Sequence, residues 1–324
     1  MGHYLVTGAA GFIASKVVEL LLDDGHTVTG LDNLNDVYDV RLKQWRLQRL
    51  CCPAFDFREL DICDREALRE QVFEGASFDA VINLAARAGV RQSVADPHLY
   101  IQTNVEGALT LLECCRTFGV GKFVQASTSA VYGAATKAPC RENQPTDQLL
   151  SPYAASKKAA EALCHTYHCL HDMDITVLRY FTVYGPAGRP DMAPLRFVRW
   201  IAEEQPLTVY GDGRQSRDFT YVDDAARGTI LALGKVGYEV FNLGSDQPVV
   251  ILDVIHMFEE LLGKKAHLVF AARHKADVPA TWANISKAGA LLGWTPQIDF
   301  SEGAGRLAAW YTEHRDWVRT IRMD

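Results

Sequence analysis

The sequence has no apolar run that approaches the roughly 20 residues needed to cross a bilayer, which argues against a membrane protein. No basic segment followed by an apolar segment opens the chain, so we expect no secretory signal. The eight cysteines form no C-x-x-C pair, which argues against a zinc site, and we expect no metal. A net charge of -7 does not favour a nucleic-acid partner. We therefore expect a cytoplasmic protein whose thiols stay reduced.

Hydrophobic residues make up 48% of the 324 residues, and their spacing alternates between strand and helix patterns. Strands are predicted at 4–8, 26–33, 55–62, 78–86, 122–129, 175–185 and 239–245, and helices at 14–25, 64–73 and 104–119. This alternation predicts an α/β fold with a Rossmann-type doubly wound parallel sheet. It weakens after about residue 186, where loop-rich segments indicate a smaller C-terminal α/β lobe. The strand at 239–245 is expected to return to the main sheet.

A glycine-rich segment, "TGAAGFIAS" (7–15), lies between the first strand and the first helix. Its glycines, Gly8 and Gly11, would let the backbone approach a pyrophosphate at the helix N-terminus. A purely structural turn would give the same pattern, because the spacing is not G-x-G-x-x-G. Asp32 closes the second strand, 21 residues after Gly11. An acid there can bind ribose hydroxyls and would repel a 2′-phosphate, which favours NAD over NADP.

The segment "SPYAASKKAAE" (151–161) places Tyr153 and Lys157 four residues apart in a predicted helix. They therefore share one helix face, which could also be an ordinary helix surface. A strand that ends at "ASTSAVYG" (126–133) comes before this helix, so Thr128 can converge on the pair at the ligand crevice. An ammonium beside a phenol is expected to lower the phenol's pKa. Tyr153 could then act as a general base towards a hydroxyl that Thr128 also holds.

Taken together, the motifs resemble the extended short-chain dehydrogenases/reductases, and within them the nucleotide-sugar epimerases. The motifs are "TGAAGFIAS", "LDNLND", "LDICD", "NLAARAGV", "NVEGALTLLE", "ASTSAVYG", "SPYAASKKAAE", "RYFTVYGP", "SRDFTYVDD" and "DVPATWANISKA". The family usually has glycine where this chain has Ala14, and a methyl group is tolerated there if the site only packs helix against strand. The resemblance also implies a homodimer, joined through the helices at 104–118 and 153–170.

The resemblance implies NAD as the cofactor and a division of the chain between cofactor and substrate. The implied cofactor contacts are Gly8, Gly11, Phe12, Ile13, Asp32, Asn33, Asn35, Asp61, Ile62, Leu84, Ala85, Ala86, Asn104, Tyr153, Lys157 and Tyr180. Residues 1–181, with about 218–248, would form the NAD-binding Rossmann domain. Residues from about 182–217 and 249–324 would form the lobe that binds a UDP-sugar.

Several reactions of the family begin alike: Tyr153 takes the proton of the sugar 4-hydroxyl, and the C4 hydride passes to NAD. Residues 128–133 of this chain read T-S-A-V-Y-G. At the same positions the 4,6-dehydratases carry a sequence similar to T-D-E-V-Y-G, and the UDP-glucuronate decarboxylases carry one similar to T-S-E-V-Y-G. This chain lacks both acids, since Ser129 and Ala130 stand in their places. A 4-epimerase needs neither acid, because its keto sugar takes the hydride back on the other face.

The segment "RYFTVYGPAGRPDMA" (179–193) resembles the UDP-glucuronate 4-epimerases. An arginine fork suits a carboxylate, although Arg189 could also be a solvated loop residue. Neutral-sugar epimerases usually carry Asn where this chain has Thr182, which favours a uronate. In this subgroup Arg217 would meet the diphosphate, although it could be an ordinary surface arginine, and Asp277 would contact the ribose. The implied substrate contacts are Arg87, Thr128, Ser129, Thr182, Arg189, Arg217, Arg273 and Asp277.

The sequence therefore predicts a 4-epimerase that interconverts UDP-glucuronate and UDP-galacturonate. Two enzymes on the same scaffold are the alternatives, a UDP-glucose 4-epimerase and a UDP-glucuronate decarboxylase. A third possibility is an NAD-binding protein without catalysis, because the fold alone does not establish a reaction.

Overall fold

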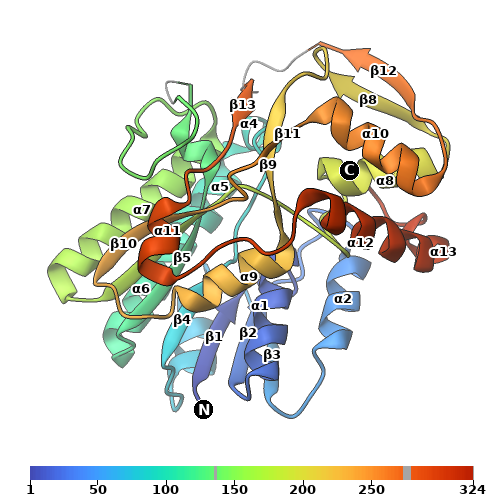
Figure 1. Ribbon diagram of the computed structural model, residues 1–324. Helices are drawn as coiled ribbons and strands as arrows, with labels where there is room; N and C mark the ends of the chain where they lie inside the picture. Colours follow the sequence, from blue (N-terminus) through green and yellow to red (C-terminus); the bar gives the residue numbers. More distant parts are fainter. Residues whose placement is uncertain (135–136, 273–278, 324) are drawn as a thin grey trace.

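A computed structural model describes residues 1–134, 137–272 and 279–323 (Figure 1). Within them, seven strands form one sheet in the order β10-β6-β5-β4-β1-β2-β3, and every neighbouring pair is parallel. The strands are β1 (His3–Thr7), β2 (Thr27–Asp32), β3 (Phe55–Glu59), β4 (Ala80–Asn83), β5 (Lys122–Thr128), β6 (Asp174–Tyr180) and β10 (Tyr238–Leu243). The predicted α/β fold class and the predicted return of the chain to this sheet at β10 are confirmed.

Helices cover both faces of this sheet, and its central strands β5 and β6 are buried along their whole length (Figure 1). One face packs against α1 (Phe12–Asp23), α2 (Val40–Arg49) and α9 (Val222–Leu231). The other packs against α3 (Arg65–Ala67), η1 (Leu68–Phe73), η2 (Gln102–Glu106), α6 (Gly107–Phe118) and α7 (Pro152–His171). Short helices α4 (Gln92–Ala95) and α5 (Pro97–Ile101) contact α7, and η3 (Ser129–Tyr132) directly follows β5.

A smaller lobe lies beside the carboxyl ends of the main strands (Figure 1). In the described residues its strands are β7 (Thr182–Tyr184), β9 (Ser216–Tyr221), β11 (Pro248–Val250) and β13 (Ala280–Thr281), with a separate pair of β8 (Pro206–Tyr210) and β12 (His267–Ala271). Its helices are α8 (Ala193–Ala202), α10 (Ile251–Leu262), α12 (Phe300–Glu313) and α13 (Arg315–Val318), whereas α11 (Ser286–Leu292) packs against β10 at the edge of the main sheet.

The prediction of a single strand over 175–185 is wrong. The chain leaves the main sheet after Tyr180, and residues 182–184 pair with β9 of the smaller lobe instead. Phe181 marks the change, and its backbone N–H still donates to Leu243 of β10. The apolar run continues across the break because both strands are buried, so hydrophobicity alone does not reveal that they belong to different sheets.

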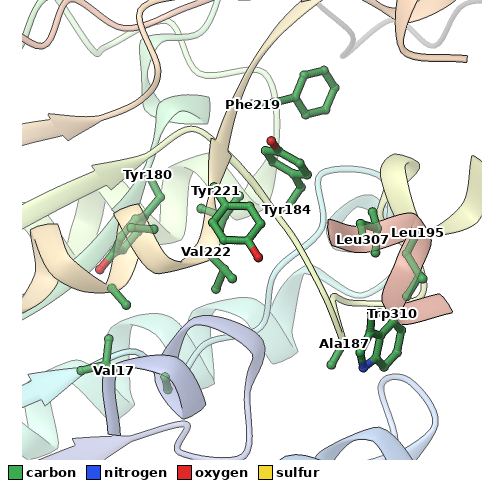
Figure 2. Close-up of a cluster of buried hydrophobic side chains, with 14 of the residues drawn as sticks. Val17, Tyr180, Tyr184, Ala187, Leu195, Phe219, Tyr221, Val222, Leu307 and Trp310 are labelled. Atoms are coloured by element: carbon green, nitrogen blue, oxygen red, sulfur yellow. The ribbon is translucent and has the colours of Figure 1, made fainter. Parts of the chain in front are cut away.

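One hydrophobic cluster joins the main sheet to the smaller lobe. Figure 2 shows Val17 of α1 at one side of this cluster and Leu307 and Trp310 of α12 at the other. Tyr184, after the break between β6 and β7, lies between them, and Tyr180, before the break, lies on the side of Val17. Shared burial of this kind holds the two parts in a fixed relation, which a site between them requires.

The strand order reverses between β1 and β4, and ligands bind at such a point in open α/β sheets. The two strand ends are tied together, because Thr7 Oγ1 donates to Asn83 Oδ1 at 2.7 Å and accepts from the N–H of Ala85 at 3.2 Å. Loops that leave β1 and β4 therefore open a crevice from a rigid base. Among the helices in the described ranges, none combines the length and apolar composition of a membrane span.

Candidate active site

A cavity of about 540 Å³ lies at this crevice and extends to the smaller lobe. Loops that follow β1, β2, β4 and β5 form one side of it, and β7, β9 and β13 contribute to the other. Most of the residues that the sequence singled out line it. They are Gly8, Gly11, Phe12, Ile13, Asp32, Asn33, Asn35, Asp61, Ile62, Leu84, Ala85, Ala86, Thr128, Ser129, Tyr153, Lys157, Tyr180, Thr182, Arg189 and Arg217.

The glycine loop after β1 has the geometry of a phosphate site. Gly8 has φ +69°, and a Cβ atom there would lie 2.9 Å from the backbone of Ala85. A Cβ atom on Gly11 would lie 2.8 Å from the carbonyl oxygen of Gly8. Gly11 caps α1 without a side-chain hydrogen bond, so the first N–H groups of the helix remain available to an anion. Ala14 is 2% exposed and belongs to the core, but it also lines the cavity, so its methyl group does not only pack helix against strand.

The far end of the cavity presents polar groups suited to an adenosine ribose. Asp32 ends β2, and its Oδ1 accepts from the N–H of Leu34 at 2.8 Å and from Lys43 Nζ at 3.1 Å. Asn33 Nδ2 donates to Asp61 Oδ2 at 2.7 Å. Burial raises the pKa of Asp61, but the Cys63 N–H and the Asn33 amide outweigh it and leave that pKa lowered. A carboxylate at the end of the second strand can accept hydrogen bonds from free ribose hydroxyls. Together with the glycine loop at a helix N-terminus, it suits a dinucleotide whose ribose carries no 2′-phosphate.

Tyr153, Lys157 and Thr128 converge, as the spacing predicts. Tyr153 and Lys157 lie in the first turns of α7, which begins where Ser151 Oγ accepts the N–H of Ala154 at 3.2 Å. Lys157 Nζ donates to the carbonyl of Ala126 in β5 at 2.9 Å. The Thr128 hydroxyl, at the end of β5, hydrogen-bonds the phenol of Tyr153. The arrangement thus places a phenol, a hydroxyl and an ammonium around one end of the cavity.

The expected direction of the Tyr153 pKa shift is wrong for the protein alone. Burial raises the pKa of Tyr153, and the Thr128 hydrogen bond and the Arg189 charge oppose that shift without overcoming it. Burial also lowers the pKa of Lys157 to about 8, against the opposing charges of Cys164 and Glu161. In water the neighbouring ammonium would favour the phenolate, whereas desolvation in the protein disfavours both charged forms.

Arg189 lies at the sugar end of the cavity, together with Thr182 and Ser129. Its guanidinium donates from Nε to Asp191 Oδ1 at 3.0 Å and from Nη2 to Asp191 Oδ2 at 2.6 Å. Nη2 also donates to the carbonyl of Ala88 at 3.3 Å. The charge is therefore fixed by the protein before any ligand is considered.

Two predicted contacts do not line the cavity. Asn104 is 2% exposed, and its side chain bonds the backbone N–H and carbonyl of Arg87, each at 2.9 Å, and Ser156 Oγ at 2.8 Å. It thereby fixes the loop after β4 from behind. Arg87 itself belongs to this loop and does not line the cavity, but its charge lowers the pKa of Asp61. The predicted contacts Arg273 and Asp277 lie outside the described residues.

The cavity also includes residues that the sequence argument missed. They are chiefly Val37, Tyr38, Lys43, Ala88, Gly89, Val90, Phe181, Met192 and Thr281. Lys43 forms an ion pair with Asp32, and the two side chains are only 5% and 6% exposed. A signal was available, because Tyr38 and Lys43 closely follow the motif "LDNLND" (31–36) in the chain, although the predicted contacts of this segment end at Asn35.

Comparisons with known proteins agree with this geometry. Residues 4–244 match the NAD dependent epimerase/dehydratase family. The chain is 52% identical to a UDP-glucuronate 4-epimerase of Thermodesulfobacterium geofontis (strain OPF15), with both chains covered in full. It is 39% identical to a crystal structure of UDP-glucuronic acid 4-epimerase from Bacillus cereus in complex with UDP-glucuronic acid and NAD, with a TM-score of 0.89 over 96% of this chain and 99% of that chain.

A more distant structure has nearly the same fold. The UDP-glucose 4-epimerase of Thermotoga maritima, with UDP-glucose, is 31% identical, with a TM-score of 0.88 over 97% of this chain and 99% of that chain. Fold similarity alone therefore does not separate uronate from neutral-sugar enzymes. The family match over most of the chain and the identities over the full length establish that this chain belongs to the NAD dependent epimerase/dehydratase family.

Proposed function

We propose that this enzyme interconverts UDP-glucuronate and UDP-galacturonate by epimerisation at C4. The observation that carries the proposal is the sugar end of the cavity, where Arg189, Thr182 and Ser129 lie with the Tyr153 and Thr128 pair. A half-buried guanidinium among hydroxyl groups recognises a carboxylate better than it recognises a neutral hydroxymethyl group. The similar proteins from Thermodesulfobacterium geofontis and Bacillus cereus, both named as 4-epimerases of this uronate, support it.

Side chains of this protein have distinct roles in the proposed reaction. Tyr153 accepts the proton of the sugar 4-hydroxyl and later returns it, while Thr128 holds the same oxygen. The Thr128 hydroxyl and the Arg189 charge both lower the pKa of Tyr153, so they favour the phenolate against the cost of burial. Bound NAD would supply the acceptor and donor for the C4 hydride. The glycine loop at Gly8 and Gly11 and the carboxylate of Asp32 would hold that cofactor.

Two other reactions are less well supported by the cavity. A UDP-glucuronate decarboxylase of this family is expected to carry an acid where Ala130 lines the cavity. A UDP-glucose 4-epimerase is expected to carry Asn at the position of Thr182, and it would have no ligand for Arg189. A cofactor-binding protein without catalysis would not need Tyr153, Lys157 and Thr128 together.

The experiment that tests the proposal is an incubation of the purified protein with UDP-glucuronate and NAD, without added reductant, followed by chromatography and mass spectrometry. A new product of unchanged mass that comigrates with UDP-galacturonate would support the proposal. A product lighter by one CO2 would indicate a decarboxylase. No change, with conversion of UDP-glucose instead, would indicate a neutral-sugar epimerase and remove the proposed role of Arg189.

We also propose a homodimer, formed by α6 and α7. These helices pack against each other, and Tyr167 of α7 donates to Glu113 of α6. The outer face of α7 exposes small and apolar side chains, among them Ala155, Ala162 and Leu170, the last 68% exposed. Light scattering is expected to give twice the chain mass of 36.0 kDa, and a monomer at working concentration would contradict it. The cytoplasmic location remains a prediction.

For the domains, we propose that residues 1–181 hold the cofactor with the help of the segment that returns to the main sheet. The smaller lobe, at about 182–217 and 249–324, would then bind the nucleotide sugar. We propose about 218–248 as this returning segment, because α9 packs against α1 and β10 pairs with β6 within it.

A further inference from the structure

One edge of the Arg189 guanidinium is held by the protein, and the other is open. Nε and Nη2 donate to the two carboxylate oxygens of Asp191, and Nη2 donates in addition to Ala88. Nη1 makes no hydrogen bond to any residue that the structure describes. A planar fork held at two points has one orientation, so Nη1 is the edge that can meet a ligand carboxylate.

The backbone that carries Arg189 is also fixed. Ala187 has φ +53°, a left-handed conformation that costs a residue with a side chain of the order of 1 kcal/mol. Its carbonyl accepts from Arg46 Nε at 3.1 Å and from Nη2 at 2.7 Å, and Arg46 Nη1 donates to Ala10 of the glycine loop at 3.0 Å. Arg46 is 3% exposed, so these bonds are shielded from water. The turn before Arg189 is thus tied to the cofactor loop.

Asp191 contacts the cavity through Arg189. Its side chain is 17% exposed and does not line the cavity, whereas Arg189 does. The pair is close to neutral, so a uronate does not meet an uncompensated positive charge. Recognition then depends on where Nη1 points, and this direction is set by the bidentate contact with Asp191.

The orientation matters because of the chemistry of the proposed function, on which this inference rests. Oxidation at C4 of a uronate gives a β-keto acid. If the C5–C6 bond aligns with the ketone π system, that bond breaks, its electron pair forms the enolate, CO2 leaves, and C5 later takes up a proton. We propose that Asp191 is a positioning residue that holds the Arg189 fork so that the sugar carboxylate stays out of this alignment. Asp191 thereby determines that the enzyme epimerises and does not decarboxylate.

The substitution Asp191→Asn tests this. The amide keeps the shape of the side chain, but its NH2 group faces an N–H of Arg189, so the bidentate contact is lost. We expect the fraction of turnovers that release CO2 to rise about tenfold, since small misplacements of reacting groups have large effects on rate. We expect kcat for epimerisation to fall while KM does not rise, because Arg189 keeps its charge and loses the compensating carboxylate. A purely structural role of Asp191 would lower the yield of both products without changing their ratio.

The matched control is Asp316→Asn, which removes an acid from an Asp–Arg pair of α13 at the surface, where the Asp316 side chain is 96% exposed. Its product ratio should equal that of the parent. An unchanged ratio in Asp191→Asn would overturn the proposal. If that variant does not fold, Arg189→Lys decides, because an ammonium cannot be held as a fork, and an unchanged ratio there would overturn it equally. A parent enzyme that leaves UDP-glucuronate untouched would instead refute the proposed function.

Discussion

The substitution Glu161→Gln should destabilise the enzyme strongly, although Glu161 does not line the cavity. Glu161 is 2% exposed, and Arg179 beside it is 3% exposed. The carboxylate accepts from Arg179 Nε at 2.9 Å and Nη2 at 2.8 Å, from Ser127 Oγ at 2.6 Å and from Lys158 Nζ at 3.1 Å. In the variant a guanidinium charge remains buried, and its other hydrogen bonds in the described structure go to the Tyr132 hydroxyl and the Glu142 carbonyl.

Removing one partner of a buried ion pair costs about 3–5 kcal/mol of unfolding free energy. With an unfolding entropy of about 2.1 cal/mol/K per residue, a chain of 324 residues loses about 1.5 °C of Tm for each kcal/mol. Calorimetry should therefore show Tm lower by about 4–7 °C at neutral pH. The control Glu302→Gln removes an acid from the exposed pair with Arg306, whose side chains are 49% and 45% exposed. Such a pair contributes about 0.5 kcal/mol, so its Tm should change by less than about 1 °C.

The difference in Tm between the parent and Glu161→Gln should also depend on pH. Burial raises the pKa of Glu161, but the hydrogen bonds and charge of Arg179, with Ser127 and Lys158, outweigh it and leave that pKa lowered. Stability from a lowered carboxyl pKa is complete above the unfolded value of about 4.3 and is lost as pH falls through the folded value. The Tm difference between parent and Glu161→Gln should therefore shrink below about pH 4. Equal Tm changes for Glu161→Gln and Glu302→Gln would refute the reasoning about burial.

Three other predictions concern catalysis. Tyr153→Phe should lower epimerisation by a factor of about 10²–10⁴ while NAD binding, measured by fluorescence quenching, stays unchanged; activity near that of the parent would exclude Tyr153 as the base. The value of kcat/KM should fall on the alkaline side with an apparent pKa near 8, because burial lowers the pKa of Lys157 to about 8. A fall that begins only near the ordinary lysine pKa of about 10.4 would contradict this. Arg189→Ala should weaken binding of UDP-glucuronate in calorimetric titrations but leave that of UDP nearly unchanged, since only the uronate has a carboxylate for this arginine to bind; equal losses for both ligands would point to a general loss of the cavity instead.

Much of the cofactor end of the site could be predicted from the sequence, because each of its binding residues belongs to a short segment with a recognisable pattern. Gly8 and Gly11 lie between a strand and a helix, and Asp32 ends the next strand, so each residue type is tied to one short segment. The ion pair of Asp32 with Lys43 was not predicted, since Lys43 lies on a helix that no hydrophobic period had revealed. The role of Asn104 behind the cavity wall was also hidden, because its partners Arg87 and Ser156 are far from it in the chain.

The sequence by itself determined which groups are present and which of them share a helix face, as Tyr153 and Lys157 do, because a four-residue spacing has one geometric meaning in a helix. Only the tertiary structure decided how those groups behave. Burial of α7 against β5 raises the pKa of Tyr153, contrary to expectation, because desolvation depends on packing and not on neighbours in the chain. The structure also splits residues 175–185 between two sheets, and this break at Phe181 brings Thr182 and the Arg189 turn to the same cavity as Tyr153.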